Sequence, residues 1–161
     1  RHRNPCGRLQ PPSVPSSLVS AGFNCYGKGF AADYKGEFKG EYDPETLAHV
    51  LDGKFGLVWD GKSAATCSGS FGKYLRINTS HKFGLYLASA KPVIVWKEGS
   101  ICDFVISHKI GFAANSLYEI PEVLSQIDIN VYNKMVENVM NIRKEVIDMD
   151  HLRNVILSSF K

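Results

Sequence analysis

The chain has 161 residues, of which 44% are hydrophobic and 22% are charged, and its formal net charge is +3 at pH 7. This length suits one domain with a core of ordinary size, and the composition argues against a disordered chain and against a chain of membrane spans. So small a positive charge does not predict nucleic-acid binding, and it suits an anionic small ligand or an anionic membrane surface equally well.

Four cysteines lie far apart in the sequence. Cys6, Cys25, Cys67 and Cys102 form no CxxC pair and have no histidine at the spacing of a metal ligand. We therefore expect no metal site, and we expect four thiols in a reducing compartment such as the cytoplasm. Residues 1–10, RHRNPCGRLQ, contain neither an initial Met nor the apolar stretch of a signal peptide. This start is expected to be a cut inside a longer chain or a tag junction.

The first third of the chain predicts a loop, short strands and one helix. Residues 1–20 are expected to be irregular, because their proline-rich stretch suits neither a helix nor a central strand. A short strand is predicted over 23–26, and the turn after it begins at Gly27. Such a glycine turn either lets the backbone approach a ligand or is a plain turn. A further strand is predicted over 36–40, and an Asp-Pro start predicts a helix over 43–51.

Two apolar stretches without polar alternation predict buried central strands. These are residues 55–59, FGLVW, and residues 92–96, PVIVW. The pattern is typical of parallel strands that helices cover on both faces. Asp60 and residues 97–100 are then expected beyond the carboxyl ends of the strands, where such sheets bind their ligands. Residues 61–78 are rich in Gly, Ser and Thr and predict a long loop.

The helix predicted over 81–90 begins with a basic pair. Ser80 is an N-cap candidate, and His81 and Lys82 fall in the first helical turn. The amides of a helix start and its dipole favour a phosphate, and a lysine there opposes the dipole unless an anion offsets its charge. From these residues alone, a phosphate ligand and a solvated surface lysine are equally good interpretations of Lys82.

The rest of the chain continues the alternation of helices and strands. A helix with a capping box at 116–119 is expected to start or kink at Pro121, and the apolar residues from Val131 onward predict a core-facing helical stripe. The order predicts an α/β fold, a Rossmann-like three-layer domain with a mainly parallel sheet. Neither G-x-G-x-x-G nor a Walker lysine loop is present. The other elements predicted here are helices over 100–108 and 151–160 and a strand over 111–114.

Two stretches carry a resemblance to a known family. They are FGLVWDG at 55–61 and the run CSGSFGKYLRINTSHKFGLYLASAKPVIVWKEGSICDFVISHKIGFAANSLYEIPEVL at 67–124. Both resemble the carboxy-terminal half of bacterial sugar transferases of the two-Rossmann (GT-B) type, closest to glucosyl- and galactofuranosyltransferase-like enzymes. The resemblance implies a single donor-binding domain over 1–161, with carboxy-terminal helices over 129–161. An amino-terminal half outside this chain would receive the acceptor.

The resemblance, the glycine turn and the strand ends together predict the site residues. Lys82 would neutralise the departing diphosphate, helped by Ser80, and Glu98 would face the cleft; both Lys82 and Glu98 are predicted to be catalytic. Many retaining relatives carry a glutamate about seven residues before the proline of the central strand, where this chain has Leu85. The predicted donor-binding residues are Arg8 at the diphosphate, Tyr26 beside the uracil or ribose, and Gly27, Asp60, Ser80, His81, Lys82 and Trp96.

The implied activity is transfer of glucose, galactose or galactofuranose from a UDP-sugar to a glycan or glycoprotein, with retention. No metal or cofactor is expected, because Arg, Lys and helix amides stabilise the departing phosphate. Peripheral association with the inner face of a membrane and self-association stay open as partner predictions. Two other hypotheses stay open: a non-catalytic nucleotide-binding or interaction subunit, and a flavodoxin-like domain, which would need a phosphate loop after its first strand.

Overall fold

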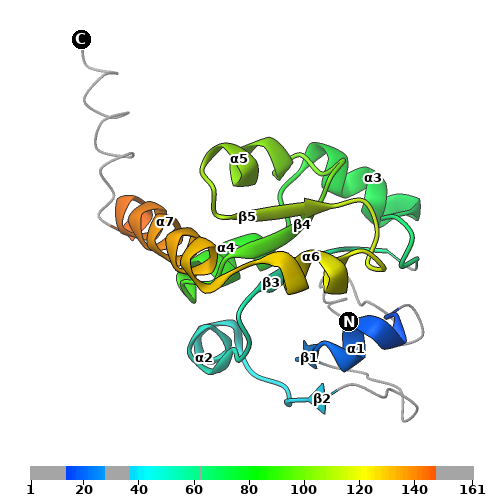
Figure 1. Ribbon diagram of the computed structural model, residues 1–161, viewed down its shortest axis with the longest axis horizontal. Helices are drawn as coiled ribbons and strands as arrows, with labels where there is room; N and C mark the ends of the chain where they lie inside the picture. The colour runs from blue at the N-terminus through cyan, green and yellow to red at the C-terminus, as the bar shows by residue number, and fades with distance from the viewer. Residues whose placement is uncertain (1–13, 28–36, 62, 148–161) are drawn as a thin grey trace, which may run out of the picture.

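The computed structural model describes residues 14–27, 37–61 and 63–147, and within them five strands and seven helices alternate along the chain (Figure 1). One sheet has the order β3–β4–β5 and the other pairs β1 with β2, and all pairing is parallel. The predicted Rossmann-like α/β fold with parallel strands is therefore confirmed. The strands are β1 (Asn24–Cys25), β2 (Glu37–Phe38), β3 (Gly56–Val58), β4 (Val93–Trp96) and β5 (Gly111–Ala114).

One helix, α1 (Ser16–Ser20), precedes β1, so the last five residues of the stretch expected to be irregular are helical; the prolines lie before this helix, and the carbonyl of Pro15 accepts its first hydrogen bonds. The other helices occupy connections between the strands and the end of the described chain. No helix within the described ranges is long and apolar enough to cross a bilayer. The predicted helix over 151–160 lies outside the described residues. The helices are α1 (Ser16–Ser20), α2 (Pro44–Val50), α3 (Gly69–Ile77), α4 (His81–Ala88), α5 (Cys102–Ser107), α6 (Ile120–Gln126) and α7 (Ile129–Ile147).

Helices cover both faces of the larger sheet, and Figure 1 shows α5 and α6 on opposite sides of β5. On one face α4 lies so close to β3 that a Cβ at Gly56 would overlap the ring of Tyr86. The same face carries the edge-to-face contact between Phe83 of α4 and Phe104 of α5, with 6.0 Å between ring centroids. Every residue of β3 and β4 is consequently buried, as their unalternated sequences predict.

Helix α7 packs where the strands of the larger sheet begin. The Tyr132 hydroxyl donates to the carbonyl of Lys54, 3.3 Å away and just before β3, and the Asn138 amide donates to Lys109, 3.0 Å away and just before β5. Val139 and Ile142 are buried on the same helix, so the predicted core-facing stripe is confirmed. The opposite end of the sheet, where the strands finish, therefore stays available for a site.

The long loop predicted over 61–78 is wrong in its second half, where α3 spans Gly69–Ile77. Phe71, Tyr74 and Leu75 stand at helical spacing in this stretch and could have indicated the helix. Phe71 and Tyr74 are exposed, and only Gly72 and Leu75 of the helix are buried. A Cβ at Gly72 would overlap the carbonyl of Cys67, which means that glycine lets the helix lie directly on the loop before it. This contact is local, because Cys67 and Gly72 are only five residues apart.

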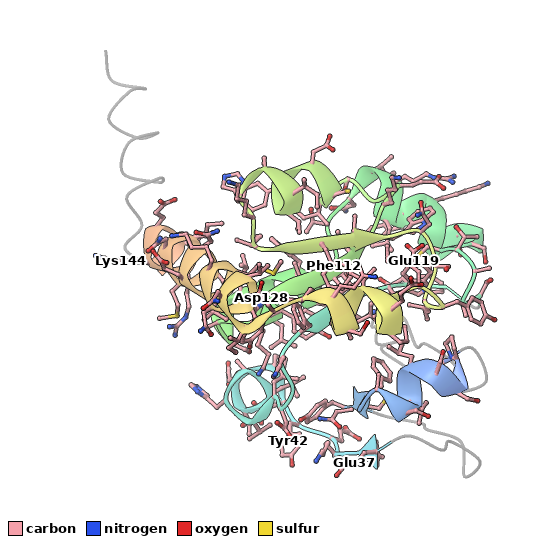
Figure 2. All side chains as sticks on the ribbon, viewed as in Figure 1. Glu37, Tyr42, Phe112, Glu119, Asp128 and Lys144 are labelled. Carbon is pink, nitrogen blue, oxygen red and sulfur yellow. The ribbon has the colours of Figure 1, made fainter. Side chains whose placement is uncertain are left out.

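The capping box predicted at 116–119 does not open a helix. The carboxylate of Glu119 accepts from the backbone amide of Asn115 and so closes the turn after β5. Helix α6 begins one residue later, at Ile120, and has Pro121 in its first turn. Figure 2 shows Glu119 beside the end of β5 and Asp128 at the junction of α6 and α7. The helix therefore starts at Ile120, the residue before the proline, which is close to one of the two expected outcomes.

Candidate functional site

Two side chains of α4 donate hydrogen bonds to backbone carbonyls on the outer edge of β3. The amide of Gly56 donates to Pro92, so Gly56 and Val58 direct their backbone groups towards β4. Because successive residues of a strand point to opposite edges, the carbonyls of Leu57 and Trp59 face away from β4. The Tyr86 hydroxyl donates to Leu57 O at 3.4 Å, and the Lys82 ammonium donates to Trp59 O at 3.2 Å.

Lys82 also forms an ion pair with a buried carboxylate. Asp60 follows Trp59 directly, and its Oδ1 contacts the Nζ of Lys82. Asp60 is 6% exposed and is the one charged residue that is buried in the described part of the chain. Ser80 caps α4, with its hydroxyl accepting from the amide of Lys82 at 3.4 Å. Asp60 therefore supplies the anion that offsets a lysine in the first turn of a helix.

The thiol of Cys67 is buried in the loop between β3 and α3. Burial raises its pKa to about 12, and the charges of Asp60, Lys82 and Glu98 all act on it. At neutral pH the thiol is protonated, so Cys67 is an inert part of the wall rather than a nucleophile.

A groove of about 1400 Å³ runs between the larger sheet and the segment that contains β1 and α2. Its apolar floor includes Leu57, Ile94 and Ile120. Its polar residues include four of the predicted site residues: Tyr26, Gly27, His81 and Lys82. Figure 2 shows Tyr42, another residue of its lining, on the β2 and α2 side of the molecule. The groove is large enough for a nucleotide with an attached sugar.

Comparison with known proteins decides the family. The family model described as the C-terminal domain of glucosyltransferase 3-like proteins matches residues 17–159. The chain belongs to this glucosyltransferase 3-like family. The β-1,6-galactofuranosyltransferase WbbI of Escherichia coli (strain K12) is 33% identical over 136 residues, which are 83% of this chain and 41% of that protein. Glucosyltransferase 3 of Streptococcus gordonii is 32% identical over 96 residues, which are 60% of this chain and 28% of that protein.

The match confirms the expected resemblance to the carboxy-terminal part of a glycosyltransferase. The alignments span less than half of the length of either curated relative. The glucosyltransferase 3-like domain therefore corresponds to one part of a larger enzyme in these relatives.

On the far side of the groove of this glucosyltransferase 3-like domain, Tyr26 is anchored by its hydroxyl. That hydroxyl donates to Val50 O at 3.3 Å and accepts from the amide of Asp52 at 2.7 Å. Gly27 has a φ of +116° and donates its amide to Gly40 O at 2.9 Å. A side chain at this φ would be strained, so the turn predicted after β1 requires its glycine.

The other predicted site residues lie outside the lining of the groove. Asp60 and Ser80 both contact Lys82 but do not line the groove themselves. Trp96 is buried in the core, at 2% exposure. Glu98 lies beyond the end of β4 and pairs with Arg76 at 2.6 Å. Arg8 lies outside the described residues. Among the residues that the structure describes, no three His, Cys, Asp or Glu side chains are grouped as metal ligands.

Sequence reasoning missed Arg76 and Tyr86. Arg76 falls in the stretch predicted to be a loop, and its partner Glu98 is 22 positions away, so no local pattern joins them. Tyr86 carried a detectable signal, because it lies four residues after Lys82 and therefore on the same face of the predicted helix.

Proposed function

We propose that this chain is the donor-binding half of a bacterial, UDP-sugar-dependent glycosyltransferase of the GT-B type. It moves glucose, galactose or galactofuranose to a glycan or glycoprotein acceptor, with retention and without a metal. The observation that supports this most is the position of Lys82, which lines the groove from the first turn of α4. A cation and helix amides at one point are suited to a diphosphate.

Stabilising the diphosphate that departs with UDP is the main chemical task in this proposal. Lys82 supplies an ammonium group whose charge Asp60 partly offsets, and His81 adds a polar ring to the same helix start. Asp60 and Trp59 O hold the ammonium, so its position is set before a donor arrives. A charge that is fixed in advance stabilises developing negative charge without having to reorganise.

The two ends of the donor would meet different elements. Tyr26 and the turn at Gly27 face the groove from the β1 side, where a flat ring and open backbone suit the uracil or ribose. Glu98, which lies just beyond the carboxyl end of β4, would face the transferred sugar. Carboxylates are good acceptors for sugar hydroxyls.

The partner and the location follow from the same proposal. The acceptor would bind through an amino-terminal half, since the relatives are more than twice as long as the matched part. We place the protein in the cytoplasm, at or near the inner face of the membrane, and leave self-association open. The buried thiols of Cys67 and Cys102 are free, which is usual in a reducing compartment.

Transfer by the full-length protein tests this function. UDP-glucose, UDP-galactose and UDP-galactofuranose are offered with a glycan acceptor, with and without a chelator, and the anomeric product is assigned by NMR. We expect transfer from one donor that survives chelation and retains configuration. Nucleotide binding without transfer from any of the donors would instead support a non-catalytic subunit.

A further inference from the structure

The turn after β4 is attached to the end of α3 at two points. The amide of Ser100 donates to the carbonyl of Leu75 at 2.8 Å, and Arg76 Nη2 donates to Glu98 Oε2 at 2.6 Å. The guanidinium also lies over the ring of Trp96, 5.1 Å from its centroid. One backbone hydrogen bond and one ion pair thus attach this short turn to α3. Without them the turn would be connected only to β4.

Stability of the fold does not account for the ion pair. The side chains of Arg76 and Glu98 are 51% and 57% exposed, and ion pairs at such sites contribute little to folding because water screens them. The pair does restrict Glu98, which would otherwise sample many rotamers in solvent. Stacking on Trp96 in turn restricts the side chain of Arg76. The carboxylate of Glu98 is therefore bound by a guanidinium whose own position is restricted.

We propose that Arg76 is a positioning residue, which holds the carboxylate of Glu98 at the carboxyl end of β4. The inference rests on the proposed function, in which Glu98 meets the sugar of the donor. Glu98 lies two residues beyond the end of β4, at the edge of a parallel sheet where ligands usually bind. Arg76 would therefore act on the sugar end of the donor, whereas Lys82 acts on its diphosphate.

The test uses the full-length transferase with Arg76→Gln, Arg76→Lys, Glu98→Gln and the double variant Arg76→Gln/Glu98→Gln. Because misplacement of a reacting group is costly, we expect Arg76→Gln to lower kcat by about 10- to 100-fold. UDP affinity, measured by calorimetry, should change less than about twofold, because the diphosphate contact is elsewhere. Arg76→Lys keeps the charge but not the planar fork, so its kcat should lie between those of the wild type and Arg76→Gln.

The double variant and a control on the same helix make the inference specific. If Arg76 acts through Glu98, the double variant should be no slower than Glu98→Gln alone, since coupled residues are not additive. Lys73→Gln removes an exposed cation one turn earlier on α3 and should leave kcat unchanged. Circular dichroism and thermal unfolding confirm that each variant is folded, and Arg76→Lys replaces Arg76→Gln if the latter is not.

Three results would overturn the inference while leaving the proposed function intact. They are an unchanged kcat in both Arg76 variants, additive losses in the double variant, and a loss of UDP affinity in Arg76→Gln without a loss of kcat. The last result would make Arg76 a ligand of the diphosphate. Failure of the unaltered enzyme to bind UDP would instead overturn the proposed function itself.

Discussion

Lys82 and Tyr86 lie one turn apart on α4 and donate to Trp59 O and Leu57 O, the two carbonyls on the outer edge of β3. These side chains satisfy two carbonyls that would otherwise be available to a neighbouring strand. The same helix turn lines the groove, so the residues that bond to this edge also form one wall of the candidate site.

Replacing Tyr86 by Phe removes the hydroxyl that bonds Leu57 O and leaves the packing against Gly56 unchanged. Loss of one such hydrogen bond should lower the free energy of unfolding by about 0.5–1.5 kcal/mol, measured by urea denaturation. Tyr118→Phe is the matched control, because Tyr118 is 62% exposed. Equal stability of the two variants would show that the Tyr86 hydroxyl does not support the edge.

Asp60 and Lys82 should show energetic coupling in a double-mutant cycle. Asp60→Asn and Lys82→Ala each remove one partner of an ion pair in which Asp60 is buried. Each single variant should be destabilised, and the double variant should lose less than the sum by about 0.5–3 kcal/mol. The cycle is measured by urea denaturation at neutral pH. Strictly additive losses would mean that the two charges act independently in solution.

Gly72 and Gly84 should respond oppositely to alanine. A Cβ at Gly72 overlaps the carbonyl of Cys67, whereas Gly84 on α4 has open space around its Cβ position. Gly72→Ala should therefore destabilise the protein by about 1–3 kcal/mol through a shift of α3. Gly84→Ala should stabilise it by about 0.5–1 kcal/mol through helix propensity. Thermal unfolding of the two variants distinguishes these effects, and an unaltered Tm in Gly72→Ala would contradict the close packing of α3.

The thiol of Cys67 should make the free energy of unfolding depend on pH in the alkaline range. Burial raises its pKa from 9.0 to about 12, so between these values the unfolded chain loses this proton and the folded chain keeps it. The folded state then binds more protons, and the free energy of unfolding should fall as pH rises from about 9 to 12, by at most about 1.4 kcal/mol per pH unit. Cys67→Ala should reduce this slope in urea denaturation. A slope identical to that of the wild type would place the thiol in contact with water.

Local patterns predicted the parts of this fold that depend on local residues. Unalternated apolar runs located β3 and β4, because strands buried on both faces leave no room for polar residues. Ser80 marked the start of α4, since a cap acts within its own turn. Once the start of α4 was located, the position of Lys82 in its first turn was also predicted correctly.

Contacts between distant residues could not be predicted in this way. Leu75 O at the end of α3 accepts from the amide of Ser100, and Glu98 is held by Arg76, across 22 positions. Asp60 was predicted as a donor-binding residue, and the structure pairs it with Lys82. Whether it also contacts a donor remains a prediction. In each case the tertiary fold determines which residue is the partner. The periodicity of the sequence carries no information about that fold-dependent pairing.

Calorimetric titration of this chain with UDP, in the wild type, Lys82→Ala and Lys144→Ala, tests the central claim most directly. Lys144 is an exposed lysine near the far end of α7, as Figure 2 shows, and serves as the control. We expect the wild type and Lys144→Ala to bind UDP equally, and Lys82→Ala to bind it more weakly by about 1.5–3 kcal/mol, the contribution of a charge-assisted hydrogen bond. Equal affinities in all three proteins, or no binding by the folded wild type, would contradict a donor site at Lys82.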